Sequence, residues 1–247
     1  MLTSRQDAYG QLIHDAFAGH DSYEVDERDD GFVGVARMAD FYLAPFADWP
    51  AHHQRAMDFA QGRVLDIGAG GGRHALHLQQ QGHDVLAVDT SPLAIKTCRE
   101  RGLKHARVLP ITQVSSRLGV FDTLLMLGNN FGLFGSERRA RWLLRRFRGL
   151  TSPDARIIAE STDPHQSRRP EDQAYLKLNR QHGRMPGQLR LRIRYRTFCT
   201  PWFDYLLVSK PEMEGILDGT GWAVQEYLDS PGPSYIALIT KQEQAPQ

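Results

Sequence analysis

A glycine-rich loop that directly follows an apolar run constrains this chain more than any other feature. Residues 64–76 read VLDIGAGGGRHAL. A short β-branched and apolar run of this kind is typical of a buried parallel strand. A glycine-rich turn that leads into a helix brings backbone N–H groups close to a bound ligand. The stretch therefore predicts a strand, a tight turn and a helix that together bind a small molecule.

The spacing of the glycines differs from the G-x-G-x-x-G pattern of dinucleotide-binding loops. Gly68 and Gly70 fill the first two glycine positions, but Arg73 occupies the third. An acid, Asp66, stands two residues before the first glycine. The loop is therefore predicted to bind something other than a pyrophosphate.

Strand-like and helical segments alternate along the chain after this loop. The strand-like runs, counting the one before the loop, lie at residues 63–68, 84–89, 106–111, 121–127 and 155–161. The helical patterns lie at residues 73–81, 91–102 and 136–149. Strands and helices that take turns at this spacing form a parallel sheet with right-handed crossovers. The sequence predicts an α/β fold with a doubly wound, mostly parallel sheet of seven strands.

The part of the chain that precedes this core has helical patterns of its own. They lie at residues 6–19 and 51–60, while the acidic stretch at residues 23–34 is expected to be an exposed loop. We therefore expect an N-terminal helical cap over residues 1–60.

The alternation of strands and helices stops after the fifth strand. Residues 189–198 alternate apolar or aromatic side chains with arginine, which is typical of a strand with one wet face. Further strand-like runs at residues 202–209 and 234–240 flank a helical pattern at residues 210–222. We expect one main domain over residues 61–247, with a basic, β-containing insertion at about residues 164–205.

Composition limits the classes of function that this chain can serve. No apolar run approaches the roughly 18 residues that a membrane span needs, and the N-terminus is amphipathic and mixed in charge, so we expect neither a membrane span nor an export signal. Cys98 and Cys199 lie far apart without the spacing of a zinc or disulfide motif. These features favour a cytoplasmic protein.

The net charge of +1 hides two opposed blocks. Residues 1–60 carry four Lys or Arg against eleven Asp or Glu, whereas residues 164–198 carry nine against two. Such blocks pair with each other, face solvent or bind a charged ligand, and the sequence leaves these possibilities open. The arginine-rich helix at 136–149 is expected to turn its arginines to solvent and, together with the next residue, to turn inward Trp142, Leu143, Phe147 and Leu150.

Four motifs, taken together, resemble a known family. They read VLDIGAGGGRHAL, VLAVDTSPLAI, FDTLLMLGNN and GLTSPDARIIAES, and they fall between about residues 62 and 161. In this order and spacing they are similar to the motifs of class I S-adenosylmethionine-dependent methyltransferases. The resemblance implies a Rossmann-like methyltransferase fold, S-adenosylmethionine as the cofactor, and methyl transfer as the activity.

The resemblance also assigns the cofactor-binding residues. Asp89 ends the second strand, where a carboxylate accepts hydrogen bonds from ribose hydroxyls. Asp66 and the glycine loop match the residues that bind the methionine end of the cofactor, which has no phosphate. Ile111 and Thr112 stand where the family often has an acid near the adenine, so backbone groups and a polar side chain are expected to contact that ring. The expected cofactor-binding residues are Asp66, Gly68, Ala69, Gly70, Gly72, Asp89, Thr90, Ile111, Thr112, Leu127, Gly128 and Asn129.

The methyl acceptor is expected beyond the carboxyl ends of the fourth and fifth strands. Asn129, Asn130 and Glu160 are the candidate catalytic residues there. The LGNN sequence differs from the N/D-P-P-Y/F motif of methyltransferases that act on amino groups of adenine or glutamine. A small-molecule acceptor is therefore favoured, and the arginines of residues 164–198 suggest an anionic or carboxylate-bearing metabolite.

Other functions remain as alternatives. An RNA methyltransferase ranks below a small-molecule enzyme because the acidic flanks of the basic segment repel a phosphate backbone. A non-catalytic S-adenosylmethionine-binding protein is a second alternative, and an NAD-dependent oxidoreductase is less favoured. No metal site is expected: His74 and His77 lack a third ligand, and His52 and His53 are neighbours that are not expected to face one site from a helix. The oligomeric state is left open.

Overall fold

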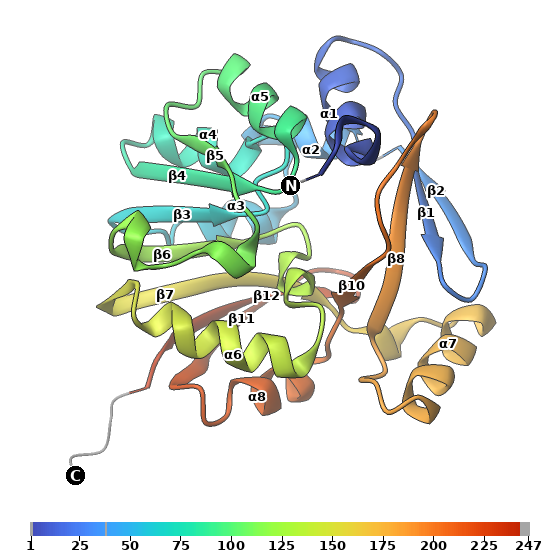
Figure 1. Ribbon diagram of the computed structural model, residues 1–247. Helices are drawn as coiled ribbons and strands as arrows, with labels where there is room; N and C mark the ends of the chain where they lie inside the picture. Colours follow the sequence, from blue (N-terminus) through green and yellow to red (C-terminus); the bar gives the residue numbers. More distant parts are fainter. Residues whose placement is uncertain (1, 38, 243–247) are drawn as a thin grey trace. The chain divides into compact units, whose positions relative to one another are not determined.

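The computed structural model describes residues 2–37 and 39–242, and within them it confirms the predicted α/β class. Strands β4 and β5 of the main sheet run parallel, as do β6 and β7, whereas β12 is antiparallel to both β7 and β11 (Figure 1). The seven strands lie in the order β11 (Trp222–Asp229), β12 (Ser234–Lys241), β7 (Thr151–Thr162), β6 (Phe121–Met126), β3 (Arg63–Ile67), β4 (Asp84–Asp89) and β5 (Ala106–Val108). This is the mostly parallel, seven-stranded sheet that the sequence predicted.

The helices of the alternating core begin where their capping residues predict. Helix α4 (Arg73–Gln80) follows the glycine loop, α5 (Pro92–Glu100) follows β4, and α6 (Glu137–Arg148) precedes β7. The hydroxyl of Ser91 accepts a hydrogen bond from the Ala94 N–H at the start of α5. Serine side chains therefore cap the starts of α5 and α6, whereas α4 begins directly after the glycine loop.

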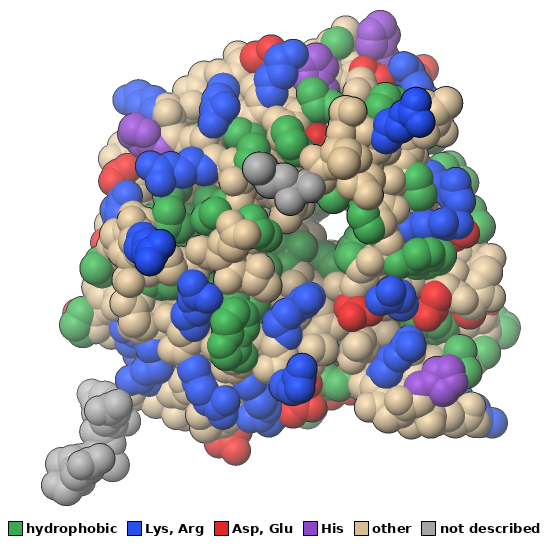
Figure 2. Space-filling view, viewed as in Figure 1, with side chains coloured by type: hydrophobic (Ala, Val, Ile, Leu, Met, Phe, Trp, Pro, Cys, Tyr) green, Lys and Arg blue, Asp and Glu red, His purple; other side chains and the backbone are tan. Residues whose placement is uncertain are grey.

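The predicted inward stripe of α6 is wrong at one position. Leu143 and Phe147 are buried as expected, but the side chain of Trp142 is 47% exposed. The buried stripe instead includes Ala140 and Leu144, which lie three or four positions from these residues. Arginine side chains cover the outer surface of this helix (Figure 2).

A second, smaller sheet corrects the expectation that residues 23–34 form a loop. Most of this stretch forms β1 (Glu24–Arg28) and the start of β2 (Val33–Ala36), which pair as an antiparallel hairpin. The hairpin turns at Gly31, whose φ of 90° suits a residue without a side chain. The sheet has the order β10-β8-β1-β2, where β8 is Gln188–Tyr195 and β10 is Phe203–Leu206, and β9 (Phe198–Cys199) pairs with β8.

Other elements, among them the short helix α2 (Ala39–Leu43), were not predicted from the sequence either. Helix α7 (Pro170–Gln181) lies in the basic segment, and β11 begins at Trp222, where the helical pattern was expected to end. Pro170 in the first turn of α7, followed by two acids, is a recognisable helix start. The remaining helices are α1 (Ala8–Phe17), α3 (Ala51–Met57) and α8 (Lys210–Leu217), and none of the described helices is long and apolar enough to span a membrane.

The opposed charge blocks meet in the second sheet. Strand β8 pairs with β1, and this brings arginines of the basic segment to the acidic N-terminal residues. Arg192 and Arg194 both contact the carboxylate of Glu27 at 2.6 Å, and Arg196 lies 3.0 Å from Asp15. Of the three possibilities that the sequence left open, the structure therefore assigns these arginines to pairing with the N-terminal block.

The chain divides into two compact units, each built from segments that are distant in sequence. Unit 1 consists of Met1–Trp49, Leu65–Gln113 and Arg190–Phe203, and unit 2 of Pro50–Val64, Val114–Leu189 and Asp204–Gln247. The two units are described separately below. The predicted division of the chain near residue 60 stays a prediction.

Candidate functional site

The glycine loop in unit 1 turns sharply between β3 and α4. The N–H groups of Gly68 and Ala69 donate to the carbonyl of Val88 on β4, at 2.8 and 3.2 Å. Gly68, Gly70 and Gly72 have φ angles of 77°, 54° and 75°, which L side chains rarely adopt. The alternating glycines are therefore required by the backbone itself.

Neighbouring helices approach this loop too closely for side chains at two of its positions. A Cβ atom on Gly71 would lie 2.7 Å from the Leu43 side chain, and one on Gly72 would lie 2.9 Å from the sulfur of Cys98. The Cys98 thiol also donates a hydrogen bond to the carbonyl of Gly70. The N-terminal helices and α5 thus pack against the loop within unit 1.

Two buried carboxylates flank the loop. Asp89, at the end of β4, accepts hydrogen bonds from the Gly70 N–H at 3.0 Å and the Ser91 N–H at 2.9 Å. Asp66, at the penultimate position of β3, is 2% exposed, and its Oδ2 has no hydrogen-bond partner within the described residues. A buried carboxylate oxygen without a partner is costly, so this atom is available to a ligand donor.

Burial sets the protonation of both carboxylates. It raises the pKa of Asp66 to about 7, an effect that the neighbouring Asp89 increases and Arg73 opposes. Burial also raises the pKa of Asp89, although the N–H groups of Ser91 and Gly70 act in the opposite direction. A cationic ligand that pairs with these groups would favour their ionised forms.

The residues present fit the methionine end of S-adenosylmethionine. Its ammonium group matches the Asp66 oxygen that has no hydrogen-bond partner within the described residues, and Gly68 and Gly70 beside it carry no side chains that would block a ligand. The other expected cofactor residues of unit 1 also lie at strand ends: Thr90 is exposed after β4, and Ile111 and Thr112 begin a 3₁₀ turn after β5.

A second group of residues, in unit 2, surrounds Glu160 near the end of β7. Glu160 is 4% exposed, and its Oε2 accepts hydrogen bonds from the N–H groups of Gly128 at 2.5 Å and Asn129 at 3.2 Å. Burial alone would raise the pKa of Glu160, but the His52 and His53 imidazoles beside it hold that pKa well below its ordinary value. Glu160 is therefore a carboxylate, held in place by the backbone after β6.

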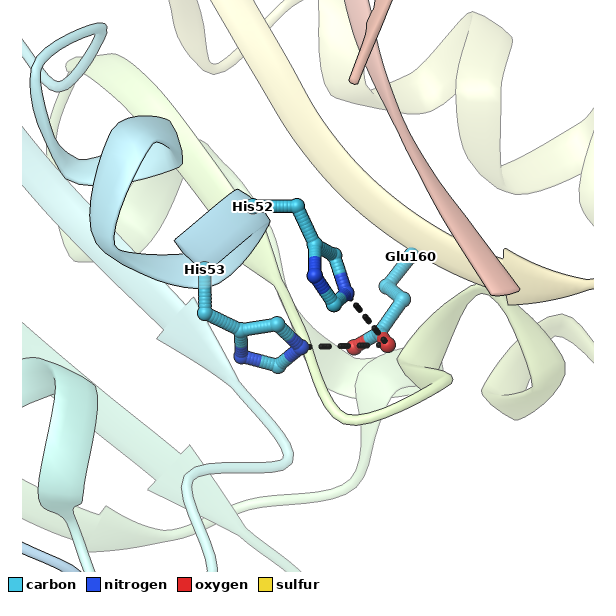
Figure 3. A group of neighbouring side chains, drawn as sticks. All are labelled: His52, His53 and Glu160. Carbon is cyan, nitrogen blue, oxygen red and sulfur yellow. Dashed lines mark ion pairs between the residues drawn. The ribbon is translucent and has the colours of Figure 1, made fainter. Parts of the chain in front are cut away.

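Both histidines of the first turn of α3 point toward Glu160 (Figure 3). The Nε2 atom of His53 lies 3.1 Å from Oε1 of Glu160, and that of His52 lies 4.0 Å from the same oxygen. The expectation that these neighbours do not face one site is wrong. Adjacent positions on a helix point about 100° apart, but the carboxylate lies between the two directions and the long imidazoles converge on it.

The remaining unit 2 candidates are held by neighbouring polar groups. Asn129 has a left-handed φ of 62°, its side-chain oxygen accepts a hydrogen bond from Thr162, and its carbonyl accepts one from the Tyr205 hydroxyl at 2.6 Å. Asn130 begins a 3₁₀ turn, and Leu127 is buried. The structure thus brings Gly128, Asn129 and Glu160 together.

The two histidines of α4 contact aromatic side chains of unit 1. His77 stacks on Phe46 with ring centroids 4.0 Å apart, and His74 lies edge-on to Trp49 at 4.8 Å. These rings pack as aromatic side chains in unit 1.

The comparisons with known proteins match this chain to methyltransferases. A methyltransferase-domain family model matches residues 64–154. The chain is 30% identical over 104 residues to the glycine/sarcosine N-methyltransferase of Halorhodospira halochloris. This matched region covers 40% of this chain and 39% of that protein. It is 29% identical over 104 residues to the glycine/sarcosine/dimethylglycine N-methyltransferase of Actinopolyspora halophila, and this match covers 39% of this chain and 18% of that protein. The matched region spans less than half the length of these relatives.

Solved structures share the fold over a larger part of the chain. The S-adenosylmethionine-dependent methyltransferase of Bacteroides fragilis, solved in complex with S-adenosyl-L-homocysteine, superposes with a TM-score of 0.84, 24% identity and 98% coverage of each chain. The CcbJ methyltransferase of Streptomyces caelestis gives a TM-score of 0.58 at 14% identity, covering 82% of this chain and 98% of that one. The fold is therefore the Rossmann-like methyltransferase fold.

Replacing Gly72 by alanine should destabilise the protein more than the same change at Gly82. Both residues have positive φ angles, of 75° and 92°, so each variant carries backbone strain of about 1–2 kcal/mol. A Cβ at Gly72 also meets buried Cys98, whereas one at Gly82 has nothing within 4 Å. We expect an additional loss of about 1–3 kcal/mol for Gly72→Ala from overpacking, measured by urea unfolding. Equal losses in the two variants would contradict the close approach.

The Asp66→Asn variant should gain stability over the wild type as the pH rises, in the absence of cofactor. The pKa of Asp66 is about 7 in the folded protein and about 3.9 in an unfolded chain. Between these values the folded state holds more protons, so the wild-type free energy of unfolding falls with rising pH by at most about 1.4 kcal/mol per pH unit. Asparagine does not titrate, so the difference between variant and wild type should be larger at pH 8 than at pH 5. The exposed Asp84→Asn serves as the control, and a difference independent of pH would argue against a buried, neutral Asp66.

Proposed function

We propose that the chain transfers a methyl group from S-adenosylmethionine to a small-molecule acceptor, in line with its methyltransferase-domain match and its Rossmann-like methyltransferase fold. The observation that carries the proposal is the unpartnered, buried oxygen of Asp66 beside a loop of left-handed glycines. This combination suits a ligand that carries an ammonium group and no phosphate. The family match over residues 64–154 supports the same conclusion.

The residues of unit 1 hold the cofactor in this proposal. Asp66 pairs with its ammonium group, and Asp89 accepts hydrogen bonds from its ribose hydroxyls through lone pairs that the Gly70 and Ser91 N–H groups leave free. S-adenosylmethionine supplies a methyl group on a sulfonium, with a neutral thioether as the leaving group. Orientation of the acceptor is then the main task of the protein, and is worth up to about 7–11 kcal/mol in well-aligned cases.

Glu160 and Asn129 act as positioning residues in this mechanism. Glu160 receives the two N–H groups after β6 and faces two imidazoles, and the Asn129 side chain accepts a hydrogen bond from Thr162. These contacts suit groups that fix the shape of a loop better than groups that take up a proton. Asn130 remains a candidate for direct contact with the acceptor.

The charges of unit 1 favour an amine as the acceptor group over an anion. Arg192, Arg194 and Arg196, which the sequence offered as ligands for an anionic metabolite, contact Glu27 or Asp15 instead. Glu24 and Asp26 lie on one face of β1, where burial of Glu24 raises its pKa to about 8, and neither has a basic partner within the described residues. The relatives described above are named as N-methyltransferases of glycine and sarcosine, which carry an amine beside a carboxylate.

Two alternatives receive less support. An RNA substrate needs uncompensated basic residues, and three arginines of the basic segment are already paired with acids. NAD binding needs a glycine where Arg73 stands, and the Arg73 guanidinium donates to the carbonyl of Phe41 at 2.9 Å.

S-adenosylmethionine and its demethylated product should bind to the protein, and NAD should not. Asp89→Ala should weaken this binding by about 1.5–3 kcal/mol, the scale of hydrogen bonds to a charged group. Asp84→Ala, an exposed acid at the other end of the same strand, should bind like the wild type. Isothermal titration calorimetry measures all three proteins. Tight NAD binding without an S-adenosylmethionine signal would overturn the proposal, and unchanged binding by Asp89→Ala would refute the ribose assignment.

Small amines should accept the label from methyl-labelled S-adenosylmethionine when metabolites and RNA are screened together. Glycine, sarcosine and other amino acids with a free amine are the first compounds to compare with their N-acylated forms, which lack a basic nitrogen. Exclusive labelling of RNA, or of anions without an amine, would contradict the acceptor assignment. Cofactor binding without transfer to any acceptor would favour a non-catalytic binding protein.

A further inference from the structure

We infer that His52, His53 and Glu160 form a binding site for one divalent transition-metal ion of the zinc type. The three side chains come from two elements of unit 2, the first turn of α3 and the carboxyl end of β7 (Figure 3). One ligand atom from each residue lies within 4.8 Å of the other two. The site shares Glu160 with the proposed methyl transfer, but metal binding itself needs neither the cofactor nor an acceptor.

The distances suit a metal after a small movement of one side chain. Zinc binds imidazole nitrogen and carboxylate oxygen at about 2.0–2.2 Å in tetrahedral geometry, which places neighbouring ligand atoms roughly 3–3.5 Å apart. The Nε2 atom of His53 lies 3.1 Å from Oε1 of Glu160, and that of His52 lies 4.0 Å away. Of the two histidines, His52 has to move closer to the carboxylate.

The position of the His52 imidazole is not explained by hydrogen bonding within the cluster. Its side chain is 9% exposed, and its Nε2 has no hydrogen-bond partner within the described residues. The 4.0 Å separation from Glu160 is too long for a hydrogen bond. A buried imidazole nitrogen that faces a carboxylate at ion-pair distance, but too far away for a hydrogen bond, has the position of a metal ligand, and a bound ion would satisfy it.

Backbone groups already orient the carboxylate for this role. Oε2 of Glu160 accepts hydrogen bonds from the N–H groups of Gly128 and Asn129, so Oε1 is turned toward the histidines. Carboxylates that bind metals are commonly fixed by such outer hydrogen bonds. A set of two imidazoles and one carboxylate suits zinc and related transition metals better than magnesium or calcium, which prefer oxygen ligands.

Three protein ligands leave one position of a tetrahedral ion open. Structural zinc sites have four protein ligands, whereas sites with three bind water or a substrate atom in the fourth position. The inferred site is therefore of the open kind.

Zinc titration of the tag-free, metal-stripped protein tests this inference. We expect one zinc ion per chain by elemental analysis after dialysis, and at least a tenfold weaker affinity in each of His52→Ala, His53→Ala and Glu160→Gln. His165→Ala is the matched control, because His165 pairs with Glu212 at 3.0 Å and is a histidine–carboxylate pair outside the inferred site. That variant should bind zinc like the wild type.

A second measurement avoids any dependence on the folding of the variants. Cobalt(II) added to the wild-type protein should give the intense visible absorption of a four-coordinate ion, and zinc should displace it. Circular dichroism and thermal unfolding establish that each variant is folded. A cobalt spectrum identical to that of the free ion, no retained zinc, or zinc binding that survives in all three folded variants would each overturn the metal site.

Discussion

The carboxylate of Asp89 is the interaction on which the geometry of the glycine loop depends. One of its oxygens receives the Gly70 N–H and the other the Ser91 N–H, so a single side chain links the loop after β3 to the start of α5. Ser91 in turn caps α5 with its hydroxyl. The cost of burying this acid is offset only because both oxygens bond to backbone donors. The strand end, the loop and the helix start are therefore specified together.

Glu160 in unit 2 and Asp89 in unit 1 both fix a loop by accepting hydrogen bonds from its backbone. Each is a buried acid at the end of a strand, and each binds backbone N–H groups of a loop that follows a neighbouring strand. Their surroundings differ in charge. Asp89 has another acid, Asp66, as its neighbour and its pKa is raised, whereas Glu160 has two imidazoles beside it and its pKa is lowered. The strand ends at Asp66 and Asp89 are thus suited to bind a cation, whereas the negative charge of Glu160 is already paired with histidines.

The sequence predicted the core of the fold because its local signals agree with each other. The glycine loop, the Ser-Pro helix start and the alternation of strand and helix all describe the same sheet. The β1–β2 hairpin was missed because its strand is rich in acids, and only its pairing with the arginines of β8 explains why such a sequence extends. The convergence of His52 and His53 was missed for a related reason: helical geometry gives the directions of two side chains, but not the position of Glu160, which is over a hundred residues away in the chain.

Charge pairing between distant segments also decides what the basic segment is able to bind. In the sequence, residues 164–198 form a cluster of arginines with few acids among them, which suggests an anionic ligand. In the folded chain Glu27 is shared by two of these arginines, and these contacts lower its pKa to about 2. An exposed pair of this kind adds little stability, but it removes two cations from the set available to a substrate. In unit 1 the buried Glu24 and the half-buried Asp26 have no basic partner within the described residues, and acids of this kind attract a cationic or amine group. The amine acceptor that we propose thus rests on which charges the fold neutralises, and the composition of the chain does not reveal these pairings.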